Sequence, residues 1–346
     1  MDRRAFAAVA VVLLLIVACG DGAAPEHRAR GLELAADGQW GAAIEQYHRA
    51  IEADPGLAAA YADRGDAYAE LGRFSRALAN AEQAIALDPA HAPAYVVRAR
   101  VSADARDAAA ALADLDHAIA LDGSLAAAYL HRAIVRRSEG DATLALDDVD
   151  RAIALDASAG RAHRERGTLL AEDGRYGDAL ASFDRAITLD GGDADAYRER
   201  GLSYLALEQY ERAAEDLGRA GGIDPNDAIA YSRRGFAHSV LGLHEEALAD
   251  YDRAITLKLT DAFTYRGRGQ TWALLGFPAR AVDDYDRALA IDPDDATSYF
   301  LRAVARNELG EPALALVDLD RARTSTRDAA LLERIERLTT FLRDAR

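Results

Sequence analysis

The sequence predicts an all-α protein built as a single array of short helical repeats. Two sets of alanines recur at a constant interval of 34 residues and never slip out of register. The first set is Ala43, Ala77, Ala111, Ala145, Ala179, Ala213, Ala247, Ala281 and Ala315, and the second is Ala50, Ala84, Ala118, Ala152, Ala186, Ala220, Ala254, Ala288 and Ala322. A fixed period of this length indicates a repeat architecture, which offers an extended surface rather than a buried pocket.

The array divides the chain into four segments. We number the positions of each unit 1 to 34, beginning at Ala24, so that nine units fill residues 24–329. The units are 24–57, 58–91, 92–125, 126–159, 160–193, 194–227, 228–261, 262–295 and 296–329. Around them we expect a signal peptide over 1–18, a short linker over 19–23 and a capping helix over 330–346.

The N-terminal segment has the layout of a secretory signal. Arg3 and Arg4 precede an apolar run over residues 5–18, which is too short to span a bilayer comfortably. The run ends Ile-Val-Ala-Cys-Gly, which resembles a bacterial lipoprotein signal. That resemblance implies cleavage before Cys19, a thioether-linked diacylglycerol on Cys19 and an acylated amine. The alternative is an ordinary signal peptide with an incidental cysteine, the only one in the chain.

Within each unit the spacing of apolar residues is helical. Positions 4, 8 and 11 share one helical face, and so do positions 20, 24 and 27. Position 15 is usually glycine, as at Gly72 and Gly242, which ends the first helix. Pro278 and Pro312 stand at position 17, where the first turn of a second helix tolerates a missing N–H. Each unit is therefore predicted to be helix, tight turn, helix, turn.

This pattern resembles the tetratricopeptide repeat. Position 8 is glycine or alanine in every unit, position 4 is tyrosine in seven units, and the alanines occupy positions 20 and 27. Small residues let two helices approach to roughly 8–10 Å, while large residues at positions 4 and 24 fill the spaces between them. The resemblance implies a right-handed α–α superhelix, the tetratricopeptide solenoid, with a partner peptide or protein on its concave face. A stripe of Leu331, Ile335, Leu338 and Leu342 predicts the capping helix.

One position departs from the family pattern. Position 7, usually leucine in the family, is arginine in all nine units: Arg30, Arg64, Arg98, Arg132, Arg166, Arg200, Arg234, Arg268 and Arg302. A helical wheel places it on the core side, away from positions 2, 5, 9, 12 and 13, which face the groove. Position 23 of the second helix is aspartate in six units and Gln46, Asn80 or Ser182 in the others, so it can accept a hydrogen bond from a guanidinium. We expect each arginine to bind position 23 of its own unit.

Composition and motifs argue against several classes of function. The net charge of -17 disfavours nucleic acid, whose phosphates need basic patches, and anionic lipid surfaces. The eight histidines show no metal-binding spacing, and neither a phosphate-binding glycine loop nor Gly-x-Ser-x-Gly occurs. Repeated Asp-x-Asp-Arg runs, such as 284–287, are interpreted as a solvated helix face rather than as catalytic acids. We therefore expect no enzyme activity, no cofactor and no metal.

The groove-facing positions of the first helices vary among the units, unlike the framework. Arginines lie there beside apolar residues, a combination that suits a peptide carrying acidic groups. The expected partner-binding residues are Arg161, Arg164, Arg198, Leu202, Phe236, Val240, Phe263, Arg266, Gln270, Phe300 and Val304. Packing of the phenylalanines between neighbouring units is the alternative. Some members of the family hold a C-terminal carboxylate with a basic residue at position 5 and asparagine at position 9, but that asparagine is missing here.

Together these features predict a membrane-anchored scaffold of the bacterial cell envelope. It would be held to the membrane through the lipid on Cys19, face the periplasm or the cell exterior, and recruit a protein or peptide partner. The alternative is a regulatory or targeting subunit of an envelope enzyme complex, for example in cell-wall or pilus assembly. Self-association through the open ends of the solenoid is a further alternative.

Overall fold

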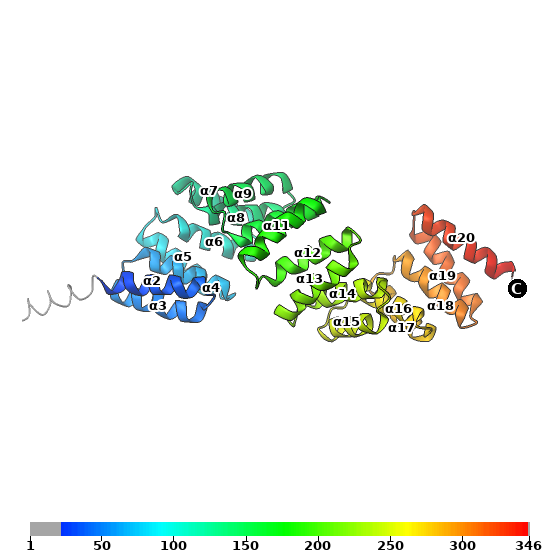
Figure 1. The fold of residues 1–346 in the computed structure, drawn as a ribbon. Coiled ribbons are helices and arrows are strands. Elements are labelled where there is room, and N and C mark those ends of the chain that lie inside the picture. Colours follow the sequence, from blue (N-terminus) through cyan, green and yellow to red (C-terminus); the bar gives the residue numbers. More distant parts are fainter. Residues whose placement is uncertain (1–21, 345–346) are drawn as a thin grey trace, which may run out of the picture. The chain divides into compact units, whose positions relative to one another are not determined.

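The computed structural model describes residues 22–344, which form 19 helices and no strand (Figure 1). The predicted all-α class is therefore confirmed over this range. The expected signal peptide at 1–18 and the lipid site at Cys19 lie outside the described residues. Among residues 22–344, no helix combines the length and the hydropathy needed to cross a membrane.

The chain divides into two compact units, residues 1–169 and 170–346, with the boundary inside helix α10. The helices up to this boundary are α2 (Ala23–Ala36), α3 (Trp40–Ala53), α4 (Ala58–Glu70), α5 (Phe74–Leu87), α6 (Ala92–Asp104), α7 (Ala108–Leu121), α8 (Ala126–Ser138), α9 (Ala142–Leu155) and α10 (Gly160–Glu172). Even-numbered labels mark the first helix of each repeat, and odd-numbered labels mark the second.

The C-terminal unit continues the same alternation. Its helices are α11 (Tyr176–Leu189), α12 (Ala194–Ala206), α13 (Tyr210–Ile223), α14 (Ala228–Val240), α15 (His244–Thr256), α16 (Ala262–Leu274), α17 (Pro278–Ile291), α18 (Ala296–Glu308), α19 (Pro312–Ser325) and α20 (Ala329–Asp344). The last of these is the predicted capping helix, and it packs on α19 through the buried Leu331 and Ile335.

Position 15 ends each first helix by taking a left-handed backbone conformation. Seven glycines there have positive φ, for instance 67° at Gly72 and 78° at Gly242. Arg106 and Glu208 occupy the same position in the third and sixth repeats and adopt φ of 60° and 56°. Because side chains with a Cβ rarely adopt this conformation, the repeat geometry overrides local preference at these two residues.

The core between paired helices is made of small residues facing large ones. Every alanine at positions 20 and 27 is at most 1% exposed. At Gly235 an added Cβ would lie 3.2 Å from the carbonyl oxygen of Ala247 and 3.2 Å from the ring of Tyr251. Such a contact is tighter than most Cβ contacts in proteins, which agrees with the small residues predicted at position 8 against positions 20 and 24.

Candidate functional site

Seven of the nine arginines at position 7 link the two helices of their own repeat. In the eighth repeat, Arg268 donates from Nε and Nη2 to Asp284 at 2.8 and 2.6 Å, and the Asp284 side chain is only 2% exposed. The predicted contact with position 23 also joins Arg64 to Asn80, Arg98 to Asp114, Arg132 to Asp148, Arg200 to Asp216, Arg234 to Asp250 and Arg302 to Asp318. These seven arginines belong to the framework and not to a binding surface.

The first repeat departs from this rule. There the Gln46 side chain hydrogen bonds to His27 at 2.9 Å, and Arg30 donates to Glu33 at 2.6 Å. The prediction for Arg30 is therefore wrong. His27, at position 4, hydrogen bonds to the predicted acceptor Gln46, and Arg30 binds Glu33 of its own helix instead.

The Asp-x-Asp runs supply two acceptors for arginine, a role that their interpretation as a solvated face did not include. The first aspartate is buried or partly buried and binds the arginine of its own repeat, whereas the second, at position 25, is exposed and in most repeats binds the arginine of the next repeat. Asp252, whose side chain is 59% exposed, accepts from Arg268 Nη1 at 2.6 Å. Equivalent contacts join Asp116 to Arg132, Asp150 to Arg166, Asp184 to Arg200 and Asp286 to Arg302. Each such arginine therefore links two repeats.

Two arginines predicted to bind a partner are instead engaged within the chain. Arg198 Nη1 lies 3.0 Å from Asp227, and Arg266 Nη1 lies 2.5 Å from Asp295. Both aspartates are buried and cap the next first helix, α14 or α18. This corrects the expectation of free cations, because each guanidinium already has a buried carboxylate. Arg164 stands at the same position of α10 and is partly buried.

Phe300 is also not available to a partner. It is 6% exposed in a cluster with Leu331 and Ile335 of α20, and Val304 packs against the same cluster. The Arg334 guanidinium lies 4.6 Å from the centre of the Phe300 ring. Since the capping helix covers Phe300, the assignment of Phe300 to a binding face is wrong, while Val304 is partly buried beside it.

An apolar patch does remain open on the first helices of the seventh and eighth repeats. We call it the Phe263 patch, and it consists of Arg233, Phe236 and Val240 of α14 and Phe263, Gln270 and Leu274 of α16. The rings of Phe236 and Phe263 lie 5.6 Å apart, centre to centre. Val240 and Leu274 are 48% and 59% exposed. Leu202 of α12, also predicted, is partly buried.

Arg233 is the residue of this patch that sequence reasoning missed. Its guanidinium lies 3.8 Å from the centre of the Phe263 ring. Its Nη1 is buried without a hydrogen-bond partner, and within residues 22–344 no carboxylate forms an ion pair with it. Burial lowers the pKa of Arg233, the negative charge of Asp261 partly offsets this effect, and the nearby Arg266 adds a smaller lowering. The sequence could have indicated Arg233 through its location at position 6, which is next to position 5, one of the positions assigned to the groove.

A cavity of mixed charge lies among the first helices of the N-terminal unit. Its volume is about 290 Å³, and we call it the Arg100 cavity. Side chains that line it include Asp66, Glu70, Val96, Arg100, Leu130 and Arg161. Arg161 therefore belongs to the N-terminal unit, where it lies beside acids, whereas the Phe263 patch belongs to the C-terminal unit.

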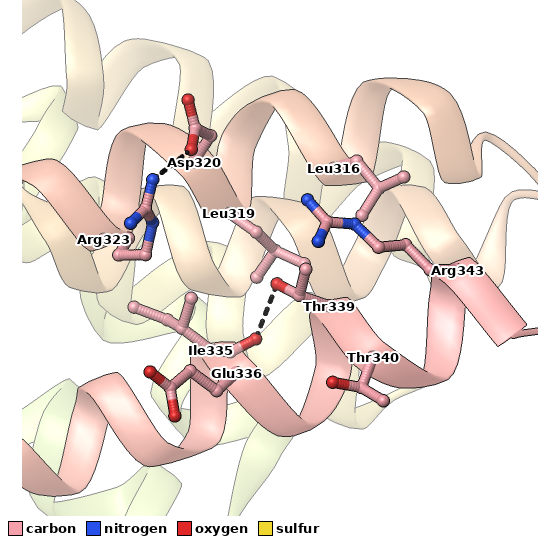
Figure 2. A pocket seen from close by; sticks show the side chains of 9 residues that line it. All are labelled: Leu316, Leu319, Asp320, Arg323, Ile335, Glu336, Thr339, Thr340 and Arg343. Carbon is pink, nitrogen blue, oxygen red and sulfur yellow. Dashed lines mark hydrogen bonds and ion pairs between the residues drawn. The ribbon is translucent and has the colours of Figure 1, made fainter.

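A groove lies at the C-terminal end of the array, between α19 and α20 (Figure 2). Leu316, Leu319 and Ile335 contribute its apolar lining, while Asp320, Arg323, Glu336 and Arg343 stand around them. Asp320 pairs with Arg323 of its own helix at 2.8 Å. Its lining is therefore largely polar and internally paired, unlike the Phe263 patch.

Among residues 22–344, no group of histidine, cysteine or acidic side chains is arranged to hold a metal ion. The most perturbed histidine is His131, whose pKa falls to about 3 because it is buried and faces Arg100 and Arg161. A histidine with so low a pKa stays neutral over the physiological range and is a poor proton carrier.

Sequence comparison identifies the class of protein that this architecture defines. Family models described as TPR repeat match residues 31–72, and those described as tetratricopeptide repeat match 58–91, 130–195, 198–262 and 275–330. The chain belongs to the tetratricopeptide repeat family. No curated protein sequence matches it significantly.

Solved structures share this fold at low sequence identity. A tetratricopeptide repeat protein from Parabacteroides merdae gives a TM-score of 0.52 at 19% identity, covering 72% of this chain and 98% of its own. The Cut9–Hcn1 hetero-tetramer of APC/C gives 0.62 at 15% identity, covering 92% and 76%. PilF of Pseudomonas aeruginosa gives 0.55 at 20% identity, covering 60% and 93%. At these identities the likeness concerns the fold alone.

Proposed function

We propose that this protein is a membrane-anchored scaffold of the bacterial cell envelope that binds a protein or peptide partner on the Phe263 patch. The observation that carries the proposal is a partly exposed aromatic and aliphatic surface on the first helices of a tetratricopeptide array, beside an arginine that forms no ion pair within residues 22–344. Family membership supports protein binding as the general role.

The chemistry of the patch indicates the kind of partner. Phe236, Phe263 and the exposed Val240 and Leu274 would gain by being covered with apolar side chains, since each square ångström removed from water contributes about 25 cal/mol. The Arg233 Nη1 atom would gain a missing acceptor. A peptide that presents an acidic group beside apolar residues satisfies both needs.

Capture of partners from crosslinked cell envelopes tests the patch. The double variant Phe263→Ala/Arg233→Ala should lose the partners that the unchanged chain retains. Phe277→Ala/Arg280→Ala is the control, because it removes another phenylalanine–arginine pair outside the patch: Phe277 is 48% exposed, and the Arg280 guanidinium lies 5.3 Å from its ring centre. Equal capture by both variants would remove the patch from consideration. An enzyme among the captured proteins would favour the alternative of a targeting subunit for cell-wall or pilus assembly.

The membrane anchor rests on the N-terminal sequence, with Arg3 and Arg4 before the apolar run and Cys19 after it. Several acyl chains on Cys19 would hold the protein firmly, since each buried CH₂ contributes roughly 0.8 kcal/mol. Cys19→Ser should move the protein from the membrane fraction to the soluble fraction. Lipidation would be contradicted if the Cys19→Ser variant stayed in the membrane fraction and the unchanged chain incorporated no labelled palmitate.

A further inference from the structure

Arg161 makes a contact that differs from the framework ion pairs of the N-terminal unit. Its Nη1 lies 2.9 Å from Glu70 Oε1, so that α10 reaches α4 across three repeats, whereas the position 7 arginines join neighbours only. The Arg161 side chain is 52% exposed, against 20% for Glu70. Ion pairs with one partner in water contribute little to stability, so another cation can displace Arg161 at low cost.

The acids at this place need a second cation besides Arg100. The Arg100 side chain is only 12% exposed, and it donates from Nη1 to Asp66 and from Nη2 to Glu70, the latter at 2.7 Å. Without Arg161, these two carboxylates would face a single guanidinium and leave one net negative charge. A partly buried charge without a partner is unfavourable, so a cation should occupy the position that Arg161 leaves.

Neighbouring groups leave this balance unchanged. Asp63, at the edge of the cavity, is already bound by Arg28 Nε at 2.6 Å. His131 is neutral, because burial and the two nearby arginines lower its pKa to about 3. Burial raises the pKa of Asp66 in spite of Arg100, whereas the pKa of Glu70 is lowered because Arg161 and Arg100 outweigh its burial.

The remaining walls suit the alkyl part of a long basic side chain. Val96 and Leu130 are 5% and 8% exposed, and Pro93 and Leu125 also line the cavity. Lysine and arginine commonly bury their methylene groups along such a surface while the charged end reaches a polar group. A volume of about 290 Å³ accommodates one side chain of this size.

Arg161 also has room to move away. A second cavity of about 260 Å³ adjoins the first, sharing Ala127, Leu130 and Arg161 as lining residues. Alanines form most of its remaining wall, at Ala126, Ala152, Ala159 and Ala162. The stem of Arg161 can therefore shift without displacing a large side chain.

We propose that Arg161 is an intramolecular stand-in, and that the Arg100 cavity binds the side chain of an arginine or lysine from a peptide that displaces it from Glu70. This subsite lies in the N-terminal unit and does not depend on the Phe263 patch. The Arg100 cavity would thus select a partner with a basic residue, whereas the Phe263 patch would bind an acidic group through Arg233.

Binding of Nα-acetyl-arginine amide, measured by NMR titration at low salt, tests the proposal. Arg161→Gln should bind the probe about threefold to fivefold more tightly than the unchanged chain, because the internal competitor is gone. Arg30→Gln is the matched control, since it removes the same charge from an exposed ion pair of the same unit. Glu70→Gln added to Arg161→Gln should abolish the gain.

The outcomes separate cleanly. Three outcomes for the gain in affinity caused by Arg161→Gln would overturn the proposal. The gain could be the same in Arg30→Gln, it could persist when Glu70→Gln is added, or it could be as large for Nα-acetyl-glutamate amide. In the unchanged chain, the bound probe should show NOE contacts to the methyl groups of Leu130 and Val96, and their absence at saturation would also overturn it. Because the probe is tested without the partner, loss of partner capture by the Phe263 patch variant bears only on the function proposed above.

Discussion

Among single residues, the arginine at position 7 governs how firmly two repeats are joined, because it has one buried and one exposed acceptor. Asp284→Ala removes the buried acceptor of Arg268 and leaves part of a shielded guanidinium unpaired, which should lower the free energy of unfolding by about 3 kcal/mol. Asp252→Ala removes the exposed acceptor of the same arginine and should cost less than about 1 kcal/mol. Urea unfolding measures the free energy of unfolding of both variants. Equal losses in the two variants would show that burial of the acceptor does not determine how strongly Arg268 stabilises the array.

Protonation of Asp250 should make stability depend on pH on the acid side. Burial alone would raise the pKa of Asp250, but hydrogen bonds and positive charge from His238 and Arg234 outweigh it and lower the pKa below its usual 3.8. Below that usual value the unfolded chain holds more protons at this residue than the folded protein does, so the free energy of unfolding falls as the pH falls. Above that pH, Asp250 makes its full contribution to the free energy of unfolding.

Asp250→Asn tests this linkage. The variant should be less stable than the unchanged protein at pH 7 and should lose less stability between pH 5 and pH 3, about 1 kcal/mol for each unit by which the pKa is depressed. The measurement is the urea midpoint as a function of pH. Parallel curves for the two proteins would mean that Asp250 titrates alike in the folded and unfolded states.

At the scale of the helical element, stability depends on small residues at the seam between paired helices. Ala247 of α15 is fully buried, and its carbonyl oxygen lies close to Gly235 of α14. Ala247→Leu should overpack this seam and lower the free energy of unfolding by about 1–3 kcal/mol. Ala249→Leu on the same helix is exposed and should change stability by less than about 0.5 kcal/mol. An unchanged melting temperature for Ala247→Leu would contradict the packing scheme.

The helices and their pairing could be predicted from the sequence because their signals are local. Position 23 lies within reach of position 7 on the facing helix, so the contact of Arg268 with Asp284 follows from a helical wheel. The second acceptor, Asp252, could not be predicted in this way, because the arginine that binds it belongs to the next repeat. Phe300 and Phe263 look alike in the sequence, and only the docking of α20 decides that the first is core and the second is surface.

At the scale of the whole molecule, tetratricopeptide arrays are expected to unfold locally. Within each unit the main helix contacts join elements one or two places apart along the chain. Stability in such arrays is approximately a sum over repeats and their nearest-neighbour interfaces, so a defect at one end should remain near that end. Arg161 is the exception inside the N-terminal unit, since it reaches Glu70 across three repeats.

Hydrogen exchange of a variant in the capping helix tests this locality. Ile335 is 1% exposed in the cluster that covers Phe300, so Ile335→Asp buries an unpaired charge and should release α20. Amide exchange should then accelerate in α18 to α20 and stay unchanged in α2 to α9. Phe341→Asp on the same helix is the control, because Phe341 is 61% exposed and its replacement should leave exchange unaltered. Acceleration throughout the chain would mean that the repeats unfold as a single cooperative body, and that partner binding at the Phe263 patch should then stabilise the Arg100 cavity as well.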